Sequence, residues 1–171
     1  TDLAENLGVK YDIIKINPVI DSIEEIFPWH NFSDENRRIT TGNVMARTRM
    51  LLLYLVANMD RRIVLGTGNK TEILLGYTTK YGDAACDILP IGGLYKTQVR
   101  QFAEFLEIPD RIIKKKPSAS LWKGQTDEDE LGACYEDIDR ILYLLIDKNY
   151  SMEKTADKLS LPVELIGDIT R

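Results

Sequence analysis

Histidine and cysteine are scarce in this sequence, which limits the chemistry that they can perform. One histidine, His30, and two cysteines, Cys86 and Cys134, occur among the 171 residues. Two cysteines without metal-ligand spacing cannot make a disulfide framework or a zinc site, so reduced thiols in a cytoplasmic protein are the simplest interpretation. A mechanism that pairs a serine or cysteine nucleophile with a histidine would depend on His30 alone, and we give it little weight.

Long hydrophobic runs and an excess of positive charge are also lacking. The longest apolar run, residues 50–57 (MLLLYLVA), is far shorter than the roughly 20 residues of a membrane-spanning helix. The formal net charge of −5 disfavours non-specific binding to nucleic acid or to an anionic membrane. We therefore expect neither a membrane nor nucleic acid as a partner.

Residues 152–169 (MEKTADKLSLPVELIGDI) offer one alternative, because two short helices around a tight turn can form a DNA-binding helix-turn-helix. From residue 163 onward the charges are Glu164 and Asp168 against only Arg171, which is unfavourable for contact with phosphates. A helical packing hairpin is the preferred interpretation.

Strands and helices alternate in the first part of the sequence, and 44% of the residues are hydrophobic, enough for one domain with a core. Residues 9–16 (VKYDIIKI) and 61–65 are apolar and β-branched, and predict buried strands. Between them, a short helix over 18–26 and a long helix that Thr40 or Thr41 can cap are expected. This order predicts an α/β fold with a parallel sheet and crossover helices.

The remainder predicts helices with one long interruption. Residues 114–132 are polar and charged without periodicity, and loops of this length inside compact domains often act as lids. Apolar residues recur at helical spacing on either side of this loop. The helices predicted there span residues 96–106, 138–145, 152–159 and 163–169.

A glycine-rich turn, residues 66–69 (GTGN), follows the second predicted strand and opens a further helix. Ligands bind at the carboxyl ends of parallel strands, and the first N–H groups of a helix can contact an anion. Thr67 can donate its hydroxyl there, and Glu72 lies in the first helical turn. The same residues also suit an ordinary helix cap, and spacing alone leaves both interpretations open. If Glu72 binds Mg²⁺, a second carboxylate and a nucleotide must complete the site.

Other charged residues are equally ambiguous from spacing alone. Lys80, Asp83 and Asp87 follow in a polar segment that suits a substrate loop or an exposed turn. Arg47 lies on the long helix, where an arginine beside an apolar face often only extends to solvent.

Five segments in this order resemble the NAD⁺ synthetase family, especially its archaeal-type ammonia-dependent form. They are GNVMARTRM (42–50), LGTGNKTEILLGYTTKYGDAACD (65–87), LPIGGLYKTQVR (89–100), KKPSASLWKGQTDEDELG (115–132) and YEDIDRIL (135–142). The resemblance implies a member of the N-type ATP pyrophosphatase superfamily, with a three-layer Rossmann-like fold of the adenine nucleotide alpha hydrolase type. It also implies ATP-dependent amidation of deamido-NAD⁺ by ammonia through an acyl-adenylate, with release of AMP and pyrophosphate.

The resemblance further implies roles for individual residues. The implied roles are ATP contacts for Thr67, Lys96 and Ser118, a Mg²⁺ ligand in Glu72, deamido-NAD⁺ contacts in Arg47, Lys80 and Asp87, and a catalytic Asp83 near the incoming ammonia. Residues 114–132 resemble a lid over the reacting phosphates. A homodimer is implied as well, for which the helix over about 41–59 is our candidate interface.

The sequence departs from the family pattern in several places. An S-G-G-x-D-S loop and a later His-Lys pair are absent, Thr78 stands where many relatives have Phe, and Ala84 where many have Gly. Thr1 is not a methionine, and Arg171 falls within a predicted helix, so we expect both ends to be incomplete and residues 1–171 by themselves to be inactive. The alternatives are another ATP-pyrophosphatase ligase resembling GMP synthetase, and an inactive binding or dimerisation unit.

Overall fold

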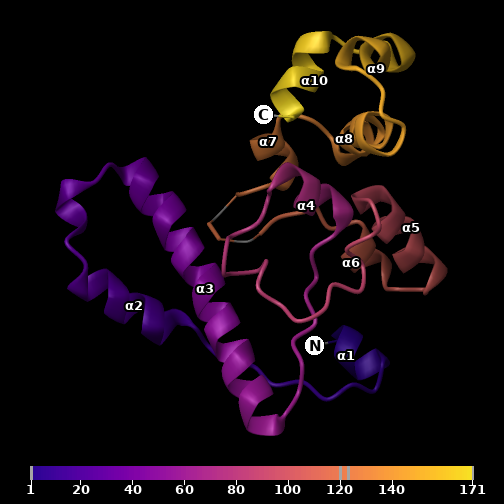
Figure 1. The fold of residues 1–171 in the computed structure, drawn as a ribbon. Helices are drawn as coiled ribbons and strands as arrows, with labels where there is room; N and C mark the ends of the chain where they lie inside the picture. The colour runs from indigo at the N-terminus through magenta and orange to yellow at the C-terminus, as the bar shows by residue number, and fades with distance from the viewer. Residues whose placement is uncertain (1, 120, 123, 171) are drawn as a thin grey trace.

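The computed structural model describes residues 2–119, 121–122 and 124–170, which are mainly helical (Figure 1). The helices are α1 (Asp2–Asn6), α2 (Asn17–Ile26), α3 (Asp34–Asp60), α4 (Lys70–Leu75), α5 (Lys96–Phe105), α6 (Asp110–Ile113), α7 (Asp127–Leu131), α8 (Tyr135–Leu142), α9 (Met152–Leu159) and α10 (Val163–Ile169), with the 3₁₀-helix η1 (Trp29–Asn31) and the π-helix η2 (Tyr143–Asp147).

The hydrophobic core lies around α8. Ile138 and Ile141 are fully buried, and Leu142 is nearly so, because they lie on one face of this helix. Around them pack Tyr95 at the start of α5, Ala156 of α9, and Ile166 and Ile169 of α10. Figure 1 shows α8, α9 and α10 gathered at one end of the molecule, while α2 and α3 lie together on another side. The two last helices thus pack into the core, as a packing hairpin does.

The predicted strands are largely unpaired in the part of the chain that the structure describes. Residues 9–16 have no regular secondary structure, and Ile13 in this segment is 74% exposed. Leu65 forms an isolated parallel bridge with Ile88, and the Gly66 N–H donates to the Ile88 carbonyl at 2.8 Å. An apolar, β-branched segment becomes a strand only when a neighbouring strand satisfies its backbone N–H and C=O groups. Among the described residues, that parallel bridge is the element of a sheet that forms.

The long helix α3 begins earlier than predicted. Ser33 caps it, because the Asn36 N–H donates to the Ser33 hydroxyl at 3.3 Å, and Asp34 and Glu35 occupy its first turn. Thr41 lies inside the helix, where its hydroxyl donates to Glu24 of α2 at 2.9 Å. The prediction that Thr40 or Thr41 caps this helix was therefore wrong. Across the described residues, no helix combines the length and the apolar character needed to cross a membrane.

The long polar loop contains a helix that its lack of periodicity concealed. Asp127–Leu131 forms α7, and the Thr126 hydroxyl accepts from the Asp129 N–H at 3.2 Å. Acidic residues in the first turn favour such a short helix, since they complement the helix dipole. Residues 120 and 123 of this loop lie outside the described residues. The prediction of an irregular segment over 114–132 was thus wrong for 127–131.

Candidate active site

A cleft of about 710 Å³ lies between α3, the turn after Val64, α4 and the segment leading into α7. It gathers five residues that were predicted to take part in the site. These are Thr67, Glu72, Asp83, Lys96 and Ser118. They come from distant parts of the sequence, so the chain folds to bring the predicted ATP, metal and catalytic positions to one cavity. Their roles stay predictions.

The glycine-rich turn is held by close packing and by a helix cap. A side chain at Gly66 would place its Cβ 2.5 Å from Cys86 Sγ and 2.7 Å from Leu89 Cδ2, so these neighbours would have to shift to accommodate any other residue. Asn69 caps α4: its side chain accepts from the Glu72 N–H at 3.1 Å, while Glu72 Oε2 accepts from the Asn69 N–H at 3.1 Å. The cap interpretation is therefore correct, and it leaves one oxygen of Glu72 for other contacts.

That second oxygen of Glu72 contacts Lys96. Lys96 Nζ lies 2.8 Å from Glu72 Oε1, and both side chains are largely shielded from solvent. The two residues occupy the first turns of α4 and α5, which pack against each other. The cleft thus contains one oriented carboxylate beside one oriented ammonium group, a pair that can bind the phosphates of a nucleotide together with their metal ion.

Sequence reasoning missed two further carboxylates in the cleft lining, Asp127 and Glu130. Asp127 is buried at the start of α7, where Tyr135 donates to its Oδ2 at 3.0 Å. The Tyr77 hydroxyl lies 2.6 Å from Glu130 Oε2 and 3.4 Å from Asp127 Oδ1. Burial raises the pKa of Asp127, and the nearby Glu72 charge adds to this effect, while the hydrogen bond from Tyr135 opposes it. The only sequence signal was the position of Asp127 inside the fourth segment.

Burial also raises the pKa of the Tyr77 and Tyr135 hydroxyls, and the neighbouring carboxylates raise it further. Both hydroxyls therefore keep their protons and act as hydrogen-bond donors to α7. Through them, the segment after α4 and the start of α8 hold the end of the predicted lid beside the cleft.

Asp83 and the three residues predicted to contact the dinucleotide form hydrogen bonds within the protein. Asp83 Oδ1 accepts from the Thr79 N–H at 2.8 Å, which orients it in the cleft wall. Arg47, Lys80 and Asp87 are outside the lining of this cleft. Arg47 Nε donates to the Lys80 carbonyl at 3.2 Å, which joins α3 to the loop after α4.

Asp87 supports the backbone below the glycine-rich turn. Its Oδ2 accepts from the Val64 N–H at 2.6 Å, and its Oδ1 accepts from the Tyr54 hydroxyl at 3.1 Å. This carboxylate therefore fixes the segment that enters the cleft. A contact from Asp87, Arg47 or Lys80 to a dinucleotide stays a prediction.

The described residues hold no group of three or more His, Cys, Asp or Glu side chains arranged to bind a metal ion. Glu72 offers one carboxylate, and the Lys96 ammonium pairs with it. Mg²⁺ in nucleotide sites is commonly held by one or two carboxylates together with phosphate oxygens and water. The donor set fits an ion that arrives with the triphosphate, and not a resident ion enclosed by protein.

Comparison with known proteins agrees with the family resemblance found in the sequence. Residues 1–171 match the NAD synthase family. An NH(3)-dependent NAD(+) synthetase from Pyrococcus horikoshii is 49% identical over 164 residues, which make up 96% of this chain and 62% of that protein. One from Methanosarcina acetivorans is 48% identical over 169 residues, 99% of this chain and 64% of that protein. The chain spans less than two thirds of the length of these relatives.

Solved structures share the arrangement of the elements. An NMN synthetase from Francisella tularensis superposes with a TM-score of 0.79 and 37% identity, over 99% of this chain and 64% of that one. The NH3-dependent NAD synthetase from Campylobacter jejuni gives a TM-score of 0.74 and 31% identity, over 98% of this chain and 62% of that one. Because the family match includes all residues and relatives reach 49% identity, the chain belongs to the NAD synthase family.

Proposed function

We propose that the protein containing this chain is an ammonia-dependent NAD⁺ synthetase. ATP adenylates the nicotinate carboxylate of deamido-NAD⁺ and pyrophosphate leaves; ammonia then displaces AMP from the acyl-adenylate to give NAD⁺. The observation that carries the proposal is the Glu72–Lys96 pair, 2.8 Å apart in one cleft with Thr67 and Ser118. The names of the relatives at 44–49% identity support the same reaction.

The chemistry explains why such a pair is needed. A carboxylate is a poor electrophile until one of its oxygens becomes a leaving group, and negative charge accumulates on the departing pyrophosphate. The Lys96 ammonium can stabilise that charge because it is already oriented before the reaction. The Thr67 and Ser118 hydroxyls supply neutral donors for the same phosphates. Glu72 would hold Mg²⁺ against the phosphates, and the ion would neutralise part of their charge.

Amide formation needs a proton acceptor for the attacking ammonia. We assign this role to Asp83, whose carboxylate lies in the cleft wall and is oriented by the Thr79 N–H. The loop 114–132, which includes α7, would exclude water from the acyl-adenylate, which hydrolyses readily. Ser118 in the cleft lining, and the α7 contacts to Tyr77 and Tyr135, support this lid role.

The larger assembly is also part of the proposal. Helix α3 exposes several apolar side chains, which are Leu51, Leu53, Leu55, Val56 and Met59. A second copy that covers this surface would form a homodimer and complete a deamido-NAD⁺ site with Arg47, Lys80 and Asp87. A three-layer Rossmann-like parallel sheet is proposed for the fold, which the parallel bridge between Leu65 and Ile88 supports. A cytoplasmic location stays a prediction from the cysteine content.

The direct test supplies the full-length protein with ATP, Mg²⁺, ammonia and deamido-NAD⁺, and measures NAD⁺ and pyrophosphate. Equal amounts of the two products are expected, with none when deamido-NAD⁺ is omitted. The likeness to an NMN synthetase makes the deamidated mononucleotide the substrate to compare. Faster amidation of the mononucleotide would show that it, and not deamido-NAD⁺, is the substrate. Pyrophosphate release without either nicotinate substrate would point to a ligase with another acceptor, such as one resembling GMP synthetase.

A further inference from the structure

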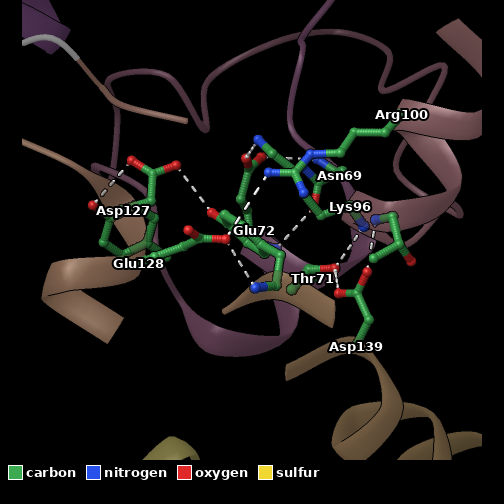
Figure 2. Close-up of polar contacts among 11 residues, drawn as sticks. Asn69, Thr71, Glu72, Lys96, Arg100, Asp127, Glu128 and Asp139 are labelled. Atoms are coloured by element: carbon green, nitrogen blue, oxygen red, sulfur yellow. Dashed lines mark hydrogen bonds and ion pairs between the residues drawn. The ribbon is translucent and has the colours of Figure 1, made fainter. Parts of the chain in front are cut away.

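A buried carboxylate outside the cleft joins the two helices that carry the Glu72–Lys96 pair. Asp139 lies on α8, is only 5% exposed and does not line the cleft. Its Oδ1 accepts from the Thr71 hydroxyl at 2.5 Å (Figure 2). Its Oδ2 accepts from the Thr97 N–H at 2.7 Å. One carboxylate therefore contacts the first turn of α4 and the first turn of α5.

Thr71 adds a direct link between the same two helices. Its side chain is fully buried, and its Oγ1 accepts from the Lys96 N–H at 2.9 Å while its hydroxyl donates to Asp139. The first N–H groups of a helix have no partner within the helix. At the start of α5, the N–H groups of Lys96 and Thr97 find theirs in Thr71 and Asp139.

The contacts of Asp139 fix the residues next to the functional pair. Glu72 follows Thr71 directly, and Lys96 precedes Thr97 directly, so each member of the pair is a chain neighbour of a group bound to Asp139. We infer that Asp139 is a positioning residue, which sets the relative position of α4 and α5 and thereby holds Glu72 and Lys96 at their 2.8 Å contact. The activity that this contact serves rests on the proposed function.

A purely structural role is the competing explanation, because Ile138 and Ile141 beside Asp139 belong to the core. The two roles differ in what a small chemical change would do. If the role is purely structural, each variant should lose activity only to the extent that it loses folding stability. A positioning role predicts a selective loss in the handling of Mg-ATP, because a displacement of about 1 Å in a catalytic group can cost roughly 100-fold in rate.

The chain offers a matched control for Thr71. Thr155 is also a fully buried threonine, but its hydroxyl has no hydrogen-bond partner among the described residues. Thr71→Val and Thr155→Val therefore remove the same group from equally buried sites, and only the first removes a contact to Asp139. Thr71→Ser keeps the hydroxyl. Asp139→Asn keeps the side-chain shape but replaces one of the two acceptor oxygens by a donor.

The experiment compares these four variants, and a double variant that combines Asp139→Asn with Thr71→Val, in the full-length protein. Mg-ATP affinity is measured by calorimetry, and kcat and KM are measured separately for ATP and for ammonia. We expect Asp139→Asn and Thr71→Val to lower Mg-ATP affinity and kcat/KM for ATP by about 10- to 100-fold, with KM for ammonia unchanged. Thr71→Ser and Thr155→Val should stay within about threefold of the parent. Because Asp139 and Thr71 act through one contact, their combined replacement should cost little more than the more severe single change.

Equal losses of Mg-ATP affinity in Thr71→Val and Thr155→Val would overturn the inference. It would also be overturned if the losses from Asp139→Asn and Thr71→Val multiplied in the double variant, because the two residues would then act independently. If Asp139→Asn does not fold, the comparison of Thr71→Val, Thr71→Ser and Thr155→Val decides. A parent protein that binds Mg-ATP but makes no NAD⁺ would overturn the proposed function, while the affinities would still decide the role of Asp139. A parent protein that does not bind Mg-ATP would overturn both.

Discussion

Lys96 Nζ and Glu72 Oε1 lie 2.8 Å apart, although 24 residues separate them in the sequence. They meet because the first turns of α4 and α5 are joined by Thr71 and Asp139. A second lysine forms a similar ion pair nearby: Lys70 Nζ lies 2.6 Å from Asp147 Oδ1, away from the cleft lining. The Lys96 and Lys70 side chains are 20% and 23% exposed, so a substitution at Lys70 is a matched control for the same substitution at Lys96.

Lys96→Met should impair catalysis, whereas Lys70→Met should not. Methionine keeps most of the length of the side chain but removes the charge that would stabilise the departing pyrophosphate. We expect kcat/KM for ATP to fall by about 100-fold or more in Lys96→Met, in line with the loss of one oriented donor from a transition state. Lys70→Met should stay within about threefold. Equal losses in steady-state assays of the two variants would contradict a special role for Lys96.

Glu72→Gln should raise the Mg²⁺ requirement without removing the helix cap. Glutamine can still accept from the Asn69 N–H, as it does in capping boxes, but it lacks the negative charge that a Mg²⁺ ligand needs. We expect the Mg²⁺ concentration for half-maximal activity to rise about tenfold. Glu153→Gln, in the first turn of α9, is the control and should leave the Mg²⁺ titration unchanged. An unchanged titration in Glu72→Gln would show that Glu72 is not a metal ligand.

Gly66→Ala should destabilise the protein, because the added Cβ would lie 2.5 Å from Cys86 Sγ. Overpacking of this kind costs about 1–3 kcal/mol, measured as the free energy of unfolding in urea. Gly93→Ala is the matched control, since no atom lies within 4 Å of its added Cβ, and its stability should change by less than about 1 kcal/mol. Cys86→Ala in the Gly66→Ala background should recover part of the loss. No recovery would mean that Leu89 or the backbone determines the cost.

Asp127→Asn should make the protein less sensitive to rising pH. Burial raises the pKa of Asp127 above its ordinary value of 3.8, so the folded state binds this proton more tightly than the unfolded state. The stability from that proton is present below pH 3.8 and is lost as the pH rises through the folded-state pKa. The difference in unfolding free energy between Asp127→Asn and the parent should therefore increase in favour of the variant as the pH rises. A difference independent of pH would contradict this.

Asp147→Asn should show the opposite dependence. The hydrogen bond from Lys70, followed by that from Tyr95, holds the pKa of Asp147 below its ordinary 3.8. The stability from this ionised carboxylate is present above pH 3.8 and is lost as the pH falls through the lower folded-state pKa. The parent should be more stable than Asp147→Asn at neutral pH, and urea unfolding should show this advantage shrinking in acid. If the parent stays more stable than Asp147→Asn in strong acid, the difference comes from packing and not from the charge of Asp147.

Elements with strong internal periodicity could be predicted, and elements that depend on a partner could not. The helix over 96–106 corresponds to α5, and the apolar positions Ile138, Ile141 and Leu142 of α8 form the core, because a helix satisfies its own backbone and needs only an apolar face. Residues 9–16 have the composition of a strand, but their backbone groups need a neighbouring strand, and they remain without regular secondary structure and mostly exposed. The start of α3 was missed although Ser33, Asp34 and Glu35 are ordinary signals for it.

The sequence by itself determined the family, through five ordered segments, and it named Glu72 and Lys96 as residues of one site. Only the tertiary structure decided that these two side chains touch, that Asp127 joins the cleft, and that Asp139 holds the underlying helices in place. Thr71 and Asp139 are 68 residues apart, and a sequence separation of that size carries no information about distance. Their contact exists because α8 buries its apolar face against α4 and α5, which leaves the Asp139 carboxylate within reach of the donors at both helix ends.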